Sequence, residues 1–406
     1  MDTGVSHADK SFKSRWILLV LLLTSFLATS GISFFSTLLP DIASTFGVSI
    51  GTASTIGLVV NCVGLIAGLL MGALTIRFKH KSLFLLGIAM LMVAELGMFF
   101  SQSFATMLLT SLFAGMGRAM VSIMIVSLIG GLFPLEKRGW AIGLVVSASF
   151  IAFVLVPSLS ASIAHVAGWR SFLIWFSFPI AVASITLGLL VIPSKSNREQ
   201  SSAKSKYLEV FKLVLLNKSA LACILGATLL TLAGTIVAYA VSFYRMNFAI
   251  PQVTAGVLAS AVAVGGIFGA VGGGRLINRC GRKPLVVVAG FVSGMAVFSF
   301  TFMSNVWVSL AFWAVSATTA AVAEVGLRSL TLEQIPRFRG PMMSLHTTFD
   351  YVGTVLGIAI GSLVLNLYAN NFQLLMSIFG VSGMASAPLL LLFARDPSKS
   401  QSPVET

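Results

Sequence analysis

Long apolar runs follow one another along the whole chain, and they limit what it can fold into more than any other feature. A helix needs about 20 mostly apolar residues to cross the hydrocarbon core of a bilayer. Within lipid, backbone polar groups must be satisfied inside the segment, so each run is expected to be helical. The twelve runs cover residues 16–39, 51–76, 82–101, 104–132, 139–163, 170–192, 219–244, 252–276, 284–304, 306–332, 340–366 and 372–394. The sequence therefore predicts an all-α polytopic membrane protein with twelve transmembrane helices.

The charge content agrees with a membrane protein. Hydrophobic residues make up 57% of the chain and charged residues only 9%, whereas a soluble domain carries roughly 25% charged residues. The net charge of +14 comes from short clusters between the apolar runs. Because that placement explains the charge through membrane orientation, we expect no nucleic-acid partner.

The loops divide sharply by charge. An even number of spans puts both termini on one side, and nearly all loop Lys and Arg residues then fall on that side. On the other side the loops hold only Arg170 and Arg245. Since basic loops stay in the cytoplasm, we expect both termini to be cytoplasmic and the chain to be integral to the plasma membrane.

The chain divides near its middle at residues 193–218, the longest polar stretch. This predicts an N-terminal half at 1–192 and a C-terminal half at 219–406, joined by a cytoplasmic linker. Apolar residues recur at helical spacing in the linker, which fits either an interfacial helix or a solvated connection. The segment Gly72–Lys81 is repeated half a chain later as Gly274–Lys283, with Gly, Leu, Arg and Lys at matching positions. The repeat indicates two pseudo-symmetric six-helix halves, and substrate sites in such proteins lie between the halves.

These two segments resemble the signature loop of the major facilitator superfamily, whose pattern is Gly-x-Leu-x-Asp-Arg-x-Gly-Arg-Lys. The second copy has Asn278 at the acidic position, whereas the first has Ile76 there. In the family that Asp helps to hold the halves in the outward-facing state, and Ile76 has no carboxylate to make that contact. The resemblance implies gating roles for Gly72, Arg77, Lys81, Gly274, Asn278, Arg279, Gly281, Arg282 and Lys283.

Three further segments resemble the family: Leu39–Ile42, Gly168–Phe172 and Gly340–Ser344. The resemblance thus covers residues 16–394, and it implies a monomer that works by alternating access. The drug:proton antiporter branch is one assignment, but its fifth-helix motif is reduced to Pro157. A second family motif, in the fourth helix, has an Arg four residues before Gly-x-Gly; here Gly115–Gly117 is present, but Ser111 stands at the Arg position.

Ionisable side chains at membrane depth are costly and are functional candidates for that reason. Asp350, Glu324 and Glu95 are the candidates for proton coupling. For Asp350 and Glu95, a buried structural hydrogen bond is the alternative. Glu324 and Arg328 are four residues apart on one helix, so a structural or gating ion pair is also expected. Arg118 is a candidate to bind an anionic solute, to partner a proton-carrying acid, or to form a structural charge pair.

Polar side chains also recur at helical spacing on the first, fourth, seventh and tenth spans. The resemblance places these spans around the central cavity, although hydroxylated residues also pack helices together. The cavity candidates are Arg118, Ser33, Thr29, Ser122, Thr231, Thr235, Tyr239, Trp313 and Ser316.

The combined expectation is a secondary active transporter that couples proton movement to export of a small amphipathic or drug-like solute. Proton-linked uptake of an organic anion or other metabolite is the main alternative, and a non-transporting membrane sensor is a second. We expect partners to be a small-molecule solute, protons and membrane lipid. The scattered cysteines and histidines suggest no metal site, and we expect no cofactor, no catalytic residue and no enzymatic activity.

Overall fold

The computed structural model describes residues 7–48, 50–193, 207–368 and 371–396, and every regular element within these ranges is helical. In this part of the chain, twelve helical spans are long and apolar enough to cross a membrane, and some of them consist of consecutive shorter helices. The all-α fold with twelve spans is therefore confirmed. Residues 194–206 of the predicted linker lie outside the described ranges.

The first six spans are built from seven α-helices and a short π-helical turn, η1, which joins α6 and α7 into one span. Their bounds are α1 His7–Phe46, α2 Ile50–Arg77, α3 His80–Phe99, α4 Phe104–Leu132, α5 Leu135–Ala167, α6 Trp169–Phe172, η1 Leu173–Ser177 and α7 Phe178–Val191.

The other six spans follow the short helix α8, and the seventh span is divided between α9 and α10. The bounds are α8 Tyr207–Leu216, α9 Lys218–Gly234, α10 Ile236–Asn247, α11 Gln252–Cys280, α12 Arg282–Ser299, η2 Phe300–Phe302, α13 Val306–Leu332, η3 Pro336–Phe338, α14 Arg339–Leu367 and α15 Phe372–Phe393.

The first helix differs most from its predicted bounds, because α1 continues past residue 39 to Phe46. Apolar content marks only the part that lipid must surround. Beyond it, the hydroxyls of Ser44 and Thr45 donate to the backbone oxygen of Asp41, which helps polar residues to continue the helix. At the tight turn before α13, the side chain of Asn305 accepts from the N–H groups of Trp307 and Val308 and caps that helix.

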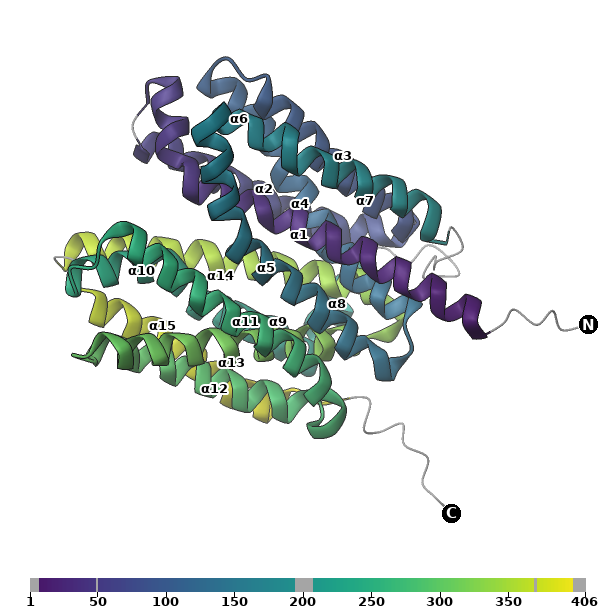
Figure 1. The fold of residues 1–406 in the computed structure, drawn as a ribbon. Coiled ribbons are helices and arrows are strands. Elements are labelled where there is room, and N and C mark those ends of the chain that lie inside the picture. The colour runs from purple at the N-terminus through teal and green to yellow at the C-terminus, as the bar shows by residue number, and fades with distance from the viewer. Residues whose placement is uncertain (1–6, 49, 194–206, 369–370, 397–406) are drawn as a thin grey trace, which may run out of the picture.

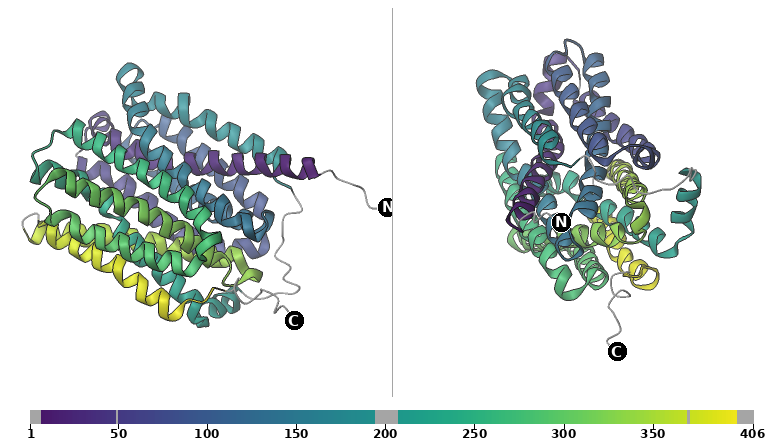
Figure 2. Two further views of the ribbon diagram at one scale, coloured as in Figure 1. Left: turned by 60° about the horizontal axis from the view of Figure 1, so that its bottom comes forward. Right: turned by 90° about the vertical axis from the view of Figure 1, so that its right-hand side faces the viewer.

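The spans form two bundles that lie against each other, α1 to α7 in one and α9 to α15 in the other (Figure 1). The start of α1 and the end of α15 lie at the same end of the molecule, which we call the terminal end; the opposite end is the distal end. The bundles meet mainly through α5 with α11 and α2 with α14. Viewed along the spans from the terminal end, α8 lies outside the two bundles (Figure 2, right).

Candidate functional site

The interface between α2 and α14 is closed at the terminal end. A methyl group on Gly340 would lie 2.6 Å from Cβ of Thr75, and one on Gly64 would lie 2.6 Å from Cζ of Tyr351. One turn or two further toward the distal end, a methyl group on Gly57 would meet nothing within 4 Å. The two helices therefore touch at the terminal end and part toward the distal end.

The interface between α5 and α11 has the same asymmetry. A methyl group on Gly274 would lie 2.8 Å from the backbone oxygen of Gly139, and one on Gly143 would lie 2.5 Å from that of Ala270. Near the distal start of α11, one on Gly256 would meet nothing within 4 Å. Glycine has no side chain, so the two backbones can approach this closely. Both interfaces thus hold the halves together at the terminal end and leave them apart at the distal end.

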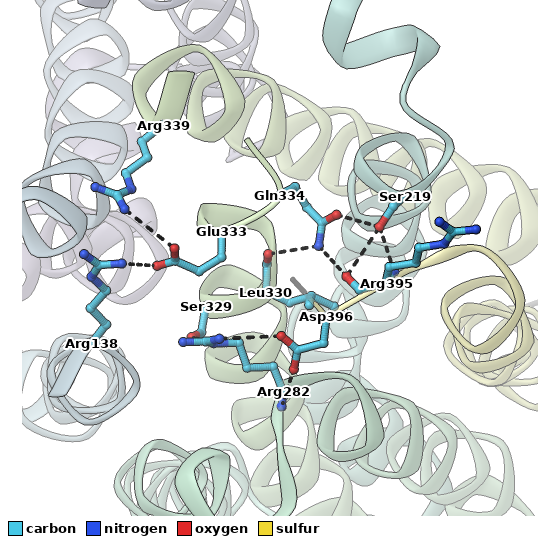
Figure 3. Close-up of polar contacts among 10 residues, drawn as sticks. All are labelled: Arg138, Ser219, Arg282, Ser329, Leu330, Glu333, Gln334, Arg339, Arg395 and Asp396. Carbon is cyan, nitrogen blue, oxygen red and sulfur yellow. Dashed lines mark hydrogen bonds and ion pairs between the residues drawn. The ribbon is translucent and has the colours of Figure 1, made fainter. Parts of the chain in front are cut away.

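A buried carboxylate reinforces the closed end (Figure 3). Oε1 of Glu333, at the end of α13, lies 2.5 Å from Nη1 of Arg138 on α5. Its other oxygen lies 3.6 Å from Nη2 of Arg339, whose Nη1 donates to the backbone oxygen of Gly130 on α4 at 2.8 Å. The Glu333 side chain is only 8% exposed. Glu333 and Arg339 of the second half therefore hold the first half directly, and we call Arg138, Glu333 and Arg339 the ionic gate.

The second signature loop is tied to the segment after α15 (Figure 3). The carboxylate of Asp396 accepts from the backbone N–H of Arg282 at 3.2 Å and pairs with its guanidinium at 3.6 Å. A carboxylate at a helix N-terminus is favoured by the helix dipole, and Arg282 begins α12. Arg282 Nε also donates to Ser329 at 2.9 Å. This part of the loop therefore stabilises the second half internally.

Among the other signature-loop residues, some contact the opposite half and some contact only their own half. Asn278 donates to the backbone oxygen of Glu136 across the interface at 2.9 Å. Lys81 donates to the backbone oxygens of Leu189 and Ile192 at the end of α7, which is a contact within the first half. The remaining loop candidates follow with their setting: Arg77 and Arg279 exposed, Gly72 buried, Lys283 half-buried, and Gly281 with φ of 82°.

Ile76, at the acidic position of the first loop, also contacts the second half. It packs against an apolar cluster that includes Phe338 and Met342 at the start of the eleventh span. An apolar contact thus stands where the family pattern has a carboxylate.

The charged residues at membrane depth in the second half form one cluster, which we call the acidic cluster. Arg328 lies 2.9 Å from Glu324 on its own helix and 3.9 Å from Asp350 on α14. Asp350 also accepts from Thr231 of α9 at 3.1 Å and lies 3.6 Å from the His346 ring. The Glu324 side chain is 41% exposed. Two carboxylates therefore share one guanidinium, and at least one of them is accessible.

Arg118 of the first half reaches the second half close to this cluster. Its Nη2 donates to Asn61 of α2 at 2.8 Å, and its Nε donates to the Tyr351 hydroxyl at 3.2 Å. The guanidinium also lies 5.2 Å from the centre of the Tyr351 ring. Within the described ranges, no carboxylate lies within 4 Å of Arg118. Its positive charge is held by neutral partners next to Asp350.

Glu95 is not part of either group. It lies on α3, whose main contacts are with α4 and α7 inside the first half. Its buried Oε2 has no hydrogen-bond partner among the residues the structure describes.

The residues predicted to line the cavity differ in their surroundings. Thr231 joins the acidic cluster, and Thr29 and Ser122 are half-buried. Ser33 is buried, with no partner for its hydroxyl in the described part of the chain.

Four of the predicted cavity residues have contacts with neighbouring helices of the second half. Trp313 stacks on Tyr244 at 5.4 Å, and the backbone oxygen of Ser316 accepts from Ser293. Thr235 donates to a carbonyl of its own helix and lies against α14, and Tyr239 donates to a carbonyl of α14. Spacing put them on shared faces, but those faces contact neighbouring helices of the same bundle.

Asn61, Tyr351, Arg138 and Arg339 were not singled out from the sequence. An amide within an apolar span, such as Asn61, is a signal that could have been used, because unsatisfied amides are costly in lipid. Tyr351 gives no such signal, since its role depends on which helix faces α14.

Two six-helix bundles meet at one end and part at the other, with charged side chains between them. This arrangement is typical of membrane transport proteins that are built from two repeated halves. The chain matches the family model described as Major Facilitator Superfamily over residues 21–272 and 223–406. The chain belongs to this superfamily. Its members are transporters rather than enzymes, which confirms that part of the expectation.

Curated relatives match over parts of their length. The MFS-type transporter YfiU of Bacillus subtilis (strain 168) is 28% identical over 215 residues, which are 53% of this chain and 40% of that protein. The 4-hydroxybenzoate transporter PcaK of Pseudomonas aeruginosa is 30% identical over 118 residues, which are 29% of this chain and 26% of that protein. The matched region is thus less than half the length of each relative.

Solved structures share the fold over nearly the whole chain. The proton:xylose symporter XylE has a TM-score of 0.81 at 14% identity. The alignment covers 95% of this chain and 97% of the symporter chain. A bacterial homologue of the iron transporter ferroportin, in its outward-facing state, has a TM-score of 0.78 at 19% identity. That alignment covers 93% of this chain and 99% of the ferroportin homologue.

Proposed function

We propose that the chain is a proton-coupled exporter of small amphipathic organic solutes, acting as a monomer in the plasma membrane. The bias of Lys and Arg toward the loops of the terminal end supports a cytoplasmic location for that end. On this assignment the ionic gate closes the cytoplasmic side, and the parted distal end faces outward.

The acidic cluster is the observation that carries the proposal. Glu324 and Asp350 compete for Arg328, and two nearby carboxylates disfavour each other's ionised form. A proton taken up by one acid leaves the other paired with Arg328. The cluster can therefore exist with or without the added proton, and each form keeps one compensated ion pair.

Contact with the first half links that proton to the conformational change. Asp350 is followed directly in the chain by Tyr351, which Arg118 holds across the interface. A change in the pairing of Asp350 is therefore one residue away from the contact that must break when the halves rearrange. Binding of a solute near Arg118 would act on the same contact from the other side.

Proton movement in energised inverted vesicles tests the proposal. A pH-sensitive dye reports whether lipophilic cations, neutral drugs or organic anions collapse the pH gradient in a protein-dependent way. We expect the wild-type protein to respond to one class and the Asp350→Asn, Glu324→Gln double variant to lose the response. Glu136→Gln is the control, because it removes an exposed acid that lies outside the cluster and is not a candidate for proton coupling. Wild-type exchange by the double variant would refute the coupling role.

Uptake of an organic anion together with a proton is the second candidate, and the neutral surroundings of Arg118 favour it. A guanidinium without a carboxylate partner suits a carboxylate on the solute. Citrate exporter 1 of Yarrowia lipolytica is among the relatives, at 24% identity over 27% of its length, and the organic anion transporter MFSD10 is among the structures with this fold. Arg118→Ala should abolish binding of carboxylate solutes and spare cations; loss of cation binding alone would favour the first candidate.

A further inference from the structure

The helix α8 lies between the two halves in sequence and against both of them in space. It contacts α9 and α14 of the second half and α2 of the first. Figure 2 shows it at the periphery of the terminal end, with its axis across the direction of the spans. Because α8 lies at the ends of the spans, we expect it at the level of the membrane interface.

One side of α8 is fixed to the protein through Val214. That side chain is 0% exposed and belongs to an apolar cluster with Ile224 of α9 and with Phe338 and Met342 at the start of the eleventh span. Ile76, at the end of α2, packs against the same cluster. The cluster therefore joins α8, the second half and the first half at the closed end.

The other side of α8 has no partner of matching chemistry within the described residues. Leu213 is 48% exposed and Leu216 is 70% exposed, three residues apart on the helix. Lys212, one turn before Leu216 on the same helix, and Lys218, the first residue of α9, are exposed as well. A helix that lies flat, with exposed leucines next to lysines, is suited to an anionic membrane surface.

We propose that α8 binds the anionic phospholipid headgroups of the leaflet at the terminal end, and that this binding stabilises the closed gate. Lys212 and Lys218 contact the headgroups, and Leu213 and Leu216 enter the boundary with the acyl chains. Because Val214 anchors the same helix on the cluster that contains Ile76, lipid that holds α8 in place also holds the two halves together. The effect on the gate rests on the rearrangement of the halves proposed above, whereas lipid binding by α8 does not.

The first measurement reports lipid contact alone, without solute or pH gradient. Full-length protein with Cys62, Cys223 and Cys280 replaced by alanine, and with Leu216→Cys carrying an environment-sensitive fluorophore, is placed in nanodiscs of phosphatidylcholine with or without phosphatidylglycerol. Phosphatidylglycerol should shift the emission to the blue and shield the fluorophore from an aqueous quencher. Two lysines near an anionic surface favour the bound helix by roughly 30-fold, so Lys212→Gln with Lys218→Gln should abolish the effect. Lys79→Gln with Lys137→Gln removes two exposed charges elsewhere on this end and should leave it intact.

The second measurement reports the gate. With Cys62 and Cys223 replaced by alanine, spin labels on Phe78→Cys of the first half and on native Cys280 of the second, both exposed, give the distance between the halves by double electron–electron resonance. Phosphatidylglycerol should increase the short-distance population, and Val214→Ala should remove that increase while the fluorophore remains shielded. Equal emission and quenching in both lipids would overturn the proposal, and so would an unchanged lipid response in the lysine variant. Either result leaves the proton-coupling test unaffected.

Discussion

At the scale of single residues, the most constrained group is the Glu333 carboxylate. It is nearly buried between Arg138 and Arg339, so its charge is stable only while both halves supply their arginines. When one member of a buried ion pair is removed, the other is left without compensation, and the loss is about 3 kcal/mol or more. Glu333 therefore stabilises the conformation that is closed at the terminal end and not the one that is open there.

Glu333→Gln should shift the protein toward the conformation that is open at the terminal end. Ser344 is buried at the closed interface, where its hydroxyl donates to the Gly68 backbone. In inverted vesicles, a thiol at Ser344→Cys should therefore react with an impermeant maleimide about 100-fold faster when Glu333→Gln is added, which corresponds to about 3 kcal/mol. Glu136→Gln is the matched control, since only the backbone of exposed Glu136 takes part in a contact across the interface. Equal rates in the two variants would contradict a gating role.

Tyr351→Phe should weaken the hold on Arg118 and keep the aromatic ring in place. A hydrogen bond to a charged group contributes about 1.5 kcal/mol, so affinity for a carboxylate solute should fall roughly tenfold, measured by isothermal titration calorimetry. Tyr368→Phe, an exposed tyrosine at the end of the same helix, should change nothing. Unaltered affinity in Tyr351→Phe would mean that Arg118 is positioned by Asn61 alone.

At the scale of helices, close backbone contact decides how α5 and α11 pack. Gly274→Val adds a Cβ atom, which would lie 2.8 Å from the Gly139 oxygen, and two methyl groups beyond it. Overpacking of this kind costs about 1–3 kcal/mol, and here the cost falls on the closed interface. We expect more labelling of Ser344→Cys from the terminal side and a lower transport rate.

The control for that substitution lies two residues away on the same helix. A methyl group on Gly272 would meet nothing within 4 Å, so Gly272→Val should leave labelling and transport near the wild-type level. If the two valine variants behave alike, general helix destabilisation explains both, and the interface argument fails.

Whole helices could be predicted from the sequence, but their neighbours could not. Lipid forces each span to be apolar and about 20 residues long, and that requirement is visible without any structure. Helical spacing shows that Trp313 and Ser316 share a face with Glu324, but it does not show that Trp313 stacks on Tyr244 inside one bundle. The pair Glu324–Arg328 was predictable because it lies on a single helix. The contacts of Arg118 with Tyr351 and of Glu333 with Arg138 depend on the packing of separate halves, and no local pattern contains them.

At the scale of the whole molecule, the two interfaces describe a single conformation that is closed at the terminal end. Given the proposed orientation, Gly57→Cys should react with an impermeant maleimide added outside intact cells, because space is free around that position. Ser344→Cys, which is buried, should not react from outside. The native cysteines are replaced in both variants. Outside labelling of Ser344→Cys at the rate of Gly57→Cys would contradict this conformation.

The glycine contacts at the closed end also bear on how the equilibrium responds to conditions. Gly139, Gly143 and Gly274 have no side-chain rotamers to immobilise, so parting these surfaces releases little side-chain entropy. The ionic gate, in contrast, is electrostatic, and dissolved ions weaken its charges once the closed end becomes hydrated. We therefore expect rising ionic strength on the cytoplasmic side to favour opening there, through the ionic gate and not through the glycine contacts.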